Sequence, residues 1–278
     1  MIATGETAAQ HRRQEKAPEG EPSRPLRVLT VSSLYPSRAR PNFGVFVENR
    51  LRHLAAFGDV RARVVSPVPW SPVPTGRESD YARAAATPAA DERFGIRVDY
   101  PRYVMIPGIG MNVQPWLYYR GLRRHVRRLI EREGRPDVID AHYVYPDGVA
   151  CALLAGELGL PLTITARGTD ISLLPDYRWP RRWISHAFAK ADHLVAVCQA
   201  LADSMIELGA DPQRLSVLRN GVDLERFKPL DRETCRADWR VDGPVLVSVG
   251  GLVERKGMDL IIEAMRALPE YSLLIAGE

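Results

Sequence analysis

Short apolar, β-branched runs alternate with amphipathic stretches along most of this chain of 278 residues. A run of about five such residues, bounded by turn residues, is typical of a strand buried in a parallel sheet, and the helical stretch after it supplies the crossover connection. About seven strands alternate with helices here, which predicts an α/β fold with a doubly wound parallel sheet. The expected strands are 26–32, 61–66, 96–100, 137–141, 162–166, 193–197 and 215–218, and the expected helices include 45–57, 116–133, 149–158 and 199–208.

A change of organisation follows the last of these strands. That strand ends at the turn Asn220-Gly221, Pro229 then halts regular structure, and a charged segment leads to a new buried strand at 245–249. We therefore expect one Rossmann-like domain and the first β-α-β of a second. The expected divisions are a disordered tail at 1–25, an N-terminal domain at 26–230, a linker at 231–242 and the start of a C-terminal domain at 243–278.

Polar residues follow two neighbouring strands of the predicted sheet. His142 comes directly after strand 137–141, and Arg167 and Asp170 come after strand 162–166. In open α/β sheets, ligands bind outside the carboxyl ends of the strands, so these residues are candidates for a ligand site. An arginine there can bind an anion, and a carboxylate can orient a hydroxyl group. As alternatives, His142 is a packing residue and Asp170 caps the helix after it.

The loop after the first strand offers a further candidate, because it carries Asn42 and Gly44 just before helix 45–57. A glycine lets a ligand approach the backbone where the helix amides point outward, which suits a phosphate or a sugar hydroxyl. The alternative is that Gly44 serves only a turn. In the second domain, Arg255 and Lys256 precede Gly257 and a helix, which predicts a clamp for a diphosphate. The alternative there is an ordinary charged helix start.

The order of these motifs resembles that of one known family. The pattern N-G-V-D-x-x-x-F-x-P, followed by a strand, V-G-G-L, E-R-K-G and a helix, resembles the hinge of the GT-B glycosyltransferases of family 4 (group 1). The segment from Asp137 to His142 is similar to the family segment whose histidine lies beside the transferred sugar. The family pattern G-R-L-x-x-x-K-G holds the donor diphosphate. Lys256 matches its lysine, but Gly251 replaces its arginine, so either Arg255 takes over that role or the diphosphate is held differently.

The resemblance implies a retaining glycosyltransferase that moves a sugar from a nucleotide-sugar donor to a hydroxyl of a glycan or lipid-linked acceptor, in cell-surface or exopolysaccharide biosynthesis. The nucleotide sugar would be a co-substrate, and neither a metal ion nor another cofactor is expected. The implied catalytic residues are His142 and Asp170, the implied acceptor-side residues of the cleft are Asn42, Gly44 and Arg167, and the implied donor diphosphate ligands are Lys256 and Arg255.

Two rival functions stay open. A nucleotide-sugar epimerase shares the fold but needs no second sugar. A non-catalytic sugar-binding or membrane-binding fragment belongs to another class. It is considered because the chain stops at Glu278, before the E-x7-E carboxylates with which the family binds the nucleotide sugar.

Cysteine spacing and the lengths of apolar runs indicate the cellular compartment in which the protein is expected. Three cysteines without C-x-x-C spacing indicate neither a disulfide framework nor a zinc site. No apolar run approaches the roughly 18 residues of a membrane span, and no signal peptide is visible. We therefore expect a cytoplasmic protein that can lie on the inner face of the plasma membrane.

The segment 116–133 is strongly basic, with six arginines against two glutamates. Basic amphipathic helices often face anionic membranes, which makes such a surface a candidate partner. A solvated helix face is the alternative. No nucleic-acid-binding motif accompanies the charge, so nucleic acid is not expected as a partner.

Overall fold

The computed structural model describes residues 24–72, 80–106 and 110–277. The chain falls into two compact units, 1–221 and 222–278, so the division comes after Gly221 where the sequence analysis placed it after residue 230. All but the last two residues of the tail expected at 1–25 lie outside the described residues.

The first unit is built on a sheet of eight strands in the order β10-β9-β8-β7-β1-β2-β5-β4. All neighbours pair in parallel except β4 and β5, which are antiparallel at the edge. The predicted doubly wound parallel sheet is therefore confirmed. The strands are β1 (Leu26–Val31), β2 (Val60–Val65), β4 (Ala90–Arg93), β5 (Ile96–Asp99), β7 (Val138–His142), β8 (Leu162–Ala166), β9 (His193–Ala196) and β10 (Leu215–Val217).

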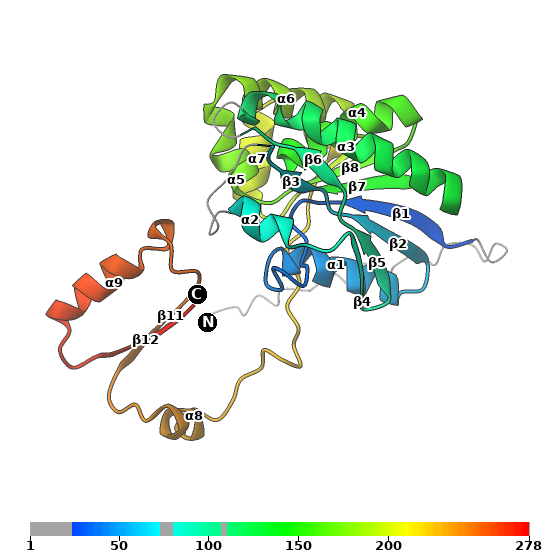
Figure 1. Cartoon of the computed structure of the whole chain (residues 1–278). Helices are drawn as coiled ribbons and strands as arrows, with labels where there is room; N and C mark the ends of the chain where they lie inside the picture. The colour runs from blue at the N-terminus through cyan, green and yellow to red at the C-terminus, as the bar shows by residue number, and fades with distance from the viewer. Residues whose placement is uncertain (1–23, 73–79, 107–109, 278) are drawn as a thin grey trace, which may run out of the picture. The chain divides into compact units, whose positions relative to one another are not determined.

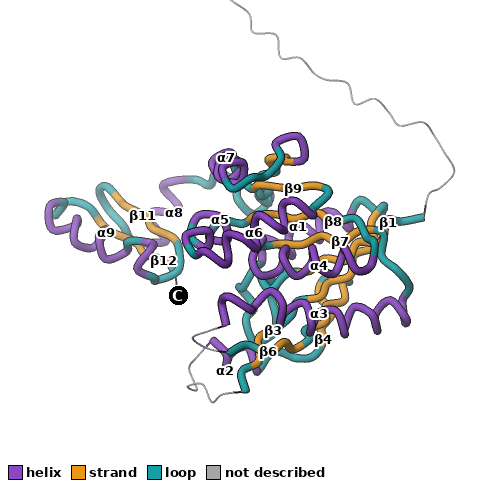
Figure 2. Tube along the Cα trace, turned by 90° about the horizontal axis from the view of Figure 1, so that it is seen from above, coloured by secondary structure: helices purple, strands orange, loops and turns teal. Residues whose placement is uncertain are grey.

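Helices cover both faces of this sheet. In Figure 1, α3, α4 and α6 lie over one face and α1 lies over the other, and in Figure 2, seen from above, these helices overlap the strands. The helices of this unit are α1 (Val45–Ala56), α2 (Asp80–Ala85), α3 (Gly110–Glu133), α4 (Val149–Leu158), α5 (Thr169–Ser172), α6 (Arg178–Lys190) and α7 (Gln199–Glu207), with short turns η1 (Val144–Gly148), η2 (Leu174–Asp176) and η3 (Pro212–Arg214).

Each face has its own hydrophobic core, because successive residues of a strand point to opposite sides of a sheet. Val64 of β2 packs into the cluster that includes Val47 and Leu51 of α1. The next residue, Val65, packs into the larger cluster, which includes Leu122 of α3 and much of α4 and α6. The first unit therefore has one hydrophobic core on each face of its sheet.

The order of the strands creates a topological switch point. β1 lies between β7 and β2, so the chain leaves β1 in one direction and leaves β7 in the other. At such a point the connections diverge and leave a crevice outside the carboxyl ends of the two strands. The loops after β1 and β7 therefore border the expected place for a ligand.

Helix α3 begins at Gly110, although the sequence analysis began it at Trp116. The helix includes Pro115, which has no N–H to donate to the carbonyl of Met111. That carbonyl instead accepts a hydrogen bond from the hydroxyl group of Tyr145. A tertiary contact thus replaces the missing helical bond and lets the helix extend past the proline.

Between the expected strands 61–66 and 96–100, where the sequence analysis named no element, the structure contains further ones. The segment Val68–Trp70 (β3) pairs in parallel with Arg102–Val104 (β6) in a small separate sheet, and α2 and the start of β4 also fall within the connection. In the described part of the chain, no helix is long and apolar enough to cross a membrane.

The second unit contains a parallel pair of strands, β11 (Val245–Val249) and β12 (Ser272–Ala276), joined through α9 (Met258–Ala264). Two short turns, η4 (Glu254–Lys256) and η5 (Met265–Ala267), flank this helix. The segment expected as a linker includes a helix, α8 (Arg232–Trp239), whose first turn is capped by the Asp231 carboxylate at 2.8 Å from the Thr234 nitrogen. The sequence signal for this cap was an aspartate three residues before a threonine, with one glutamate, Glu233, in the first turn.

Candidate active site

The centre of the candidate site is His142, the last residue of β7, which is only 1% exposed. Its Nε2 lies 2.9 Å from Oδ2 of Asp140, and its Nδ1 lies 2.7 Å from Nη2 of Arg167. Asp140 and His142 are two residues apart in a strand, so their side chains share one face of the sheet. Each ring nitrogen of His142 therefore has a hydrogen-bond partner.

These partners decide the protonation of the ring. A carboxylate only accepts and a guanidinium only donates, so the imidazole carries its proton on Nε2 and accepts at Nδ1. Burial lowers the pKa of His142, and the charges of Arg167 and Arg50 add to this against the opposing effect of Asp140. Burial raises the pKa of Asp140, but His142 and the two arginines outweigh it and bring the pKa below its ordinary value. A neutral imidazole beside an ionised carboxylate results.

Arg167 follows β8 and connects three parts of the first unit. Its Nη1 donates to Oδ1 of Asn220 at 2.9 Å, and its guanidinium lies 5.1 Å from the ring centroid of Phe46. Burial, with the nearby charge of Arg50, lowers the pKa of Arg167 to about 10, so the group is still a cation at neutral pH. Its Nε is buried without a hydrogen-bond partner among the described residues. The site thus holds a fixed cation with an unsatisfied donor, an arrangement suited to binding an oxygen of a ligand.

Asp170 is fully buried and accepts three backbone hydrogen bonds. Its carboxylate accepts from the amides of Val144 at 2.7 Å, Gly168 at 2.7 Å and Arg167 at 3.1 Å. Burial raises the pKa of Asp170, and the backbone bonds act against that rise. The carboxylate therefore holds the loops after β7 and β8 together, and the catalytic role of Asp170 stays a prediction.

Asp147 is a buried carboxyl group that the sequence analysis missed. It lies in η1 and accepts from the hydroxyl of Tyr118 at 2.6 Å, from the hydroxyl of Ser33 at 2.8 Å, and from the Ser33 amide. Burial raises the pKa of Asp147 to about 7, although these hydrogen bonds oppose the rise. Asp147 thus ties the loop after β1 to the start of α4. The available signal was the Pro-Asp-Gly turn that follows the His142 strand.

Gly44 has a structural reason to be glycine. It precedes α1 with φ 74°, and a Cβ at this position would overlap the carbonyl group of Leu34 and lie 2.8 Å from the Tyr35 nitrogen. Two parts of the loop after β1 therefore meet at Gly44, and this contact accounts for the glycine without a ligand. Asn42 of the same loop is exposed, and its side chain has no hydrogen-bond partner among the described residues.

In the second unit, Lys256 ends η4 and precedes Gly257, whose φ of 63° turns the chain into α9. The stem of Lys256 lies beside the backbone at the end of β11, with its Cδ 3.8 Å from where a Cβ on Gly250 would be. Lys256 and Arg255 are both exposed, and neither forms an ion pair within the described residues. Both cations are therefore accessible to an anion, as the sequence analysis expected of a diphosphate clamp.

No group of three or more His, Cys, Asp or Glu side chains in the described ranges is arranged to hold a metal ion. The three cysteines are free, with Cys151 buried and Cys198 exposed. That the reaction needs no metal stays a prediction.

Comparison with known proteins gives a family match. The model of Glycosyltransferase Family 4 matches residues 43–226. The chain is 28% identical over 253 residues to TuaC of Bacillus subtilis (strain 168), a glycosyltransferase named for teichuronic acid biosynthesis, and the match covers 88% of this chain and 63% of TuaC. It is 37% identical over 159 residues to a D-inositol 3-phosphate glycosyltransferase of Mycobacterium bovis, covering 53% of this chain and 33% of that protein. The chain thus spans less than two thirds of the length of these relatives.

Solved structures of other proteins have the same fold as this chain. The crystal structure of Anabaena Alr3699/HepE in complex with UDP and glucose superposes with a TM-score of 0.60 at 18% identity, over 90% of this chain and 60% of that one. UDP-GlcNAc 2-epimerase from Neisseria meningitidis, bound to UDP-GlcNAc, superposes with a TM-score of 0.52 at 14% identity, over 91% and 66%. These likenesses show a fold of GT-B type, in which transferases and epimerases both occur.

Proposed function

The chain belongs to glycosyltransferase family 4, and from this membership we propose that the protein transfers a sugar from a nucleotide-sugar donor to a hydroxyl group of a glycan or lipid-linked acceptor. The product would serve the synthesis of cell-surface or exopolysaccharide material, in the cytoplasm. The observation that carries the proposal is the connected set Asp140, His142, Arg167 and Asn220 at the topological switch point of the first unit. Fixed donors and acceptors of this kind recognise the oxygens of a sugar.

The acceptor would bind at the guanidinium group of Arg167. The guanidinium is held by His142 and Asn220, keeps its charge, and has one donor without a partner. A second cation, Arg50, is close enough to act on the same groups. Two cations favour an acceptor that bears a phosphate or carboxylate group. The names of TuaC and of the inositol phosphate transferases, which point to acidic molecules, support this choice. In this proposal His142 acts through Arg167 as a positioning residue.

The donor diphosphate would bind at Lys256, with Arg255 beside it. Negative charge develops on the diphosphate as the bond to the sugar breaks, and a cation placed there stabilises the transition state. No step of this proposal needs a resident metal ion, and full activity in the presence of EDTA would be the expected result. We propose retention of configuration at the anomeric carbon, which the C1 coupling constants of donor and product test by NMR.

Acceptor kinetics test the role of Arg167. The whole protein is assayed with labelled UDP-, GDP- and ADP-sugars and with acceptors that carry or lack an anionic group. We expect Arg167→Gln to raise KM for the anionic acceptor by on the order of tenfold or more, because a charge-assisted contact is lost. The control Arg181→Gln changes an exposed arginine of α6 and should not affect KM. An Arg167→Gln enzyme with an unchanged acceptor KM would contradict the proposal.

Two alternatives make different predictions. An epimerase would change the sugar while it stays attached to the nucleotide, and would need no acceptor. A non-catalytic sugar-binding protein would bind a sugar and release no nucleotide. Chromatography of the labelled products separates both from a transferase.

We also propose that α3 faces an anionic membrane. Arg120, Arg124, Arg128 and Arg132 follow Trp116 at intervals of four residues, so they form one stripe along the helix. Arg120 stacks on the 47% exposed Trp116, and Arg124, Arg128 and Arg132 are exposed without an ion pair among the described residues. Arg123 and Arg127 differ, because both bind Glu157, whose pKa they lower to about 2 with help from Tyr119. The exposed stripe is the part available to lipid headgroups.

Vesicle sedimentation tests this surface. Wild-type protein should sediment with vesicles that contain phosphatidylglycerol and not with pure phosphatidylcholine. Arg124→Glu/Arg128→Glu should weaken the binding at least about tenfold, since each basic residue near the surface contributes about 1 kcal/mol. Arg181→Glu/Arg182→Glu on α6 is the control with the same change of charge. Equal loss in both variants, or sedimentation that ignores lipid charge, would refute the role of the stripe.

A further inference from the structure

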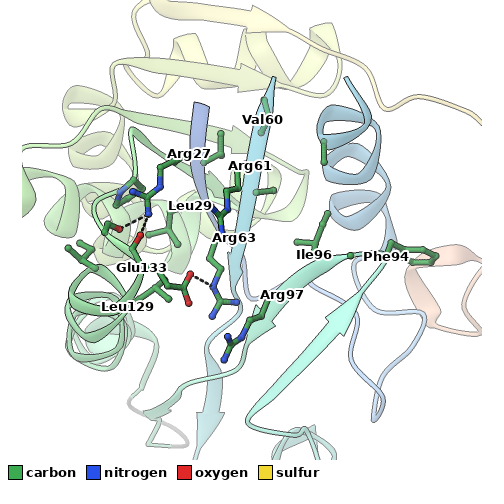
Figure 3. A pocket seen from close by; sticks show the side chains of 17 residues that line it. Arg27, Leu29, Val60, Arg61, Arg63, Phe94, Ile96, Arg97, Leu129 and Glu133 are labelled. Atoms are coloured by element: carbon green, nitrogen blue, oxygen red, sulfur yellow. Dashed lines mark hydrogen bonds and ion pairs between the residues drawn. The ribbon is translucent and has the colours of Figure 1, made fainter. Parts of the chain in front are cut away.

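A cavity of about 540 Å³ lies at the amino ends of β1 and β2, away from the carboxyl ends that carry the candidate active site (Figure 3). It exists because β2 and β5 pair only at Val64 with Val98 and at Val65 with Asp99. Before these positions the two strands separate and leave a slot in the sheet. Its volume falls within the roughly 300 to 1,000 Å³ typical of small-molecule sites.

Four arginines line this slot, against a single glutamate, Glu133. Arg27 and Arg61 are direct partners in the parallel register of β1 and β2, and such partners project to the same face. Like charges placed opposite each other on neighbouring strands are unfavourable unless something compensates them. Arg97 of β5 approaches from the other side of the slot, and Figure 3 shows its side chain next to that of Arg63.

The described residues compensate only two of the four arginines. Arg27 donates to the carbonyl oxygens of Glu133 and Gly134 at the end of α3. Arg63 binds Asp99 at 2.5 Å and Glu133 at 3.2 Å, although its Nη1 is buried without a partner. Arg61 and Arg97 are exposed and have no ion pair in the described part of the chain. Burial raises the pKa of Asp99, but the hydrogen bond to His125 and the charge of Arg63 oppose that rise. Arg97 is near enough for its charge to lower the pKa of Asp99 as well, although its effect is smaller. Two exposed guanidinium groups beside an unsatisfied buried donor form a site for a multiply charged anion.

The rest of the lining is apolar. Leu29 of β1, Leu129 of α3 and Ile96 of β5 border the slot and are each at most 5% exposed. A bare inorganic anion would not use this wall. We propose that the slot binds a phosphate ester, whose phosphate group contacts Arg61, Arg97 and Arg63 and whose organic part packs on the apolar wall. This site is distinct from the donor diphosphate clamp of the second unit and from the acceptor site at Arg167.

Arginine footprinting tests this proposal on the full chain. Phenylglyoxal modifies accessible arginines, and peptide mass spectrometry reports the modification at each position. The footprint is recorded in an Arg255→Ala/Lys256→Ala background, so that the donor clamp does not contribute. The probes are inorganic pyrophosphate, glucose 1-phosphate and dihexanoyl phosphatidic acid, with dihexanoyl phosphatidylcholine as a lipid that has no net charge. Arg181, exposed on α6, is the internal control.

We expect a phosphate ester to protect Arg61 and Arg97 at least fivefold while Arg181 is modified as before. Stronger protection by the sugar phosphate identifies a water-soluble ester, and stronger protection by phosphatidic acid identifies a lipid. Calorimetry with the better ester should show at least tenfold weaker binding for Arg61→Ala/Arg97→Ala than for the control Arg181→Ala/Arg232→Ala. Three results would overturn the proposal: no protection by either ester at millimolar concentration, equal protection of Arg181, or protection by pyrophosphate that neither ester exceeds.

Discussion

Nη2 of Arg167 donates a hydrogen bond to Nδ1 of His142 at 2.7 Å. The bond connects the carboxyl ends of two neighbouring strands, because His142 ends β7 and Arg167 directly follows β8. Burial lowers the pKa of His142, and the charge of Arg167 lowers it further. Arg167→Gln removes that charge, so we expect the pKa of His142 to rise relative to that in the wild type. NMR titration of the ring carbons measures this change, with Arg181→Gln as the control. A pKa that stays the same or falls would show that the two groups are not coupled.

Gly44 and Gly58 allow a matched test of backbone packing. Both have positive φ, 74° and 81°, but a Cβ on Gly44 would overlap the Leu34 carbonyl, whereas one on Gly58 would meet nothing within 4 Å. Gly58→Ala should cost about 1 to 2 kcal/mol of unfolding free energy, the cost of a left-handed conformation. Gly44→Ala should cost about 1 to 3 kcal/mol more, because it also overpacks the loop. Urea denaturation measures both, and equal losses would exclude a steric role for Leu34.

Asp147 predicts a specific dependence of stability on pH. Its pKa rises from 3.8 to about 7 on folding, so its stabilising contribution is complete below about pH 4 and is lost as the pH rises through about 7. Asp147→Asn does not ionise, and its amide can keep the contacts to Ser33 and Tyr118. As the pH rises between these two values, the free energy of unfolding of the wild type should fall by up to about 4 kcal/mol relative to that of the variant.

Urea denaturation near pH 4 and near pH 8 checks this difference. Relative to the wild type, the variant should have a larger free energy of unfolding at the higher pH than at the lower pH. Parallel stability curves for the two proteins would mean that Asp147 is ionised throughout this range.

Lys256→Ala tests the donor clamp. The side chain is exposed, so the free energy of unfolding should change by less than about 0.5 kcal/mol. Transfer by the whole protein should fall by about 2 to 4 kcal/mol in transition-state stabilisation, which is roughly 30-fold to 1,000-fold in rate, while acceptor binding is kept. Lys190→Ala, an exposed lysine of α6, is the control. Wild-type turnover in Lys256→Ala would remove this residue from the mechanism.

The sequence was sufficient for the fold because its strands are short, buried and separated by helices with clear periodicity. It missed the first residues of α3, where the helix includes Pro115 and the Met111 carbonyl accepts a hydrogen bond from the Tyr145 hydroxyl. No local pattern reveals such a contact between residues 34 positions apart. The short strand β3 was missed for a similar reason, since it pairs with β6, more than 30 residues later in the chain.

The candidate site was only partly predictable. His142 and Arg167 could be found because each directly follows a buried strand, and Asp140 was detectable from its spacing of two residues to His142. Asn220, 53 residues after Arg167, was read only as a turn, because its contact is a tertiary one. The catalytic role of Asp170 stays a prediction, because a buried aspartate that holds backbone amides and one that orients a substrate have the same local sequence.

The central claim is that this protein moves a sugar from a nucleotide to an acceptor. The most direct measurement follows a sugar label in a nucleotide-sugar donor incubated with the whole protein and an anionic acceptor, and quantifies the released nucleoside diphosphate in parallel. We predict that label joins the acceptor in equal amount to the nucleotide released, and that both fall together in Arg167→Gln and Lys256→Ala. Label that stays on the nucleotide, whether as the original sugar or as its epimer, would contradict the account.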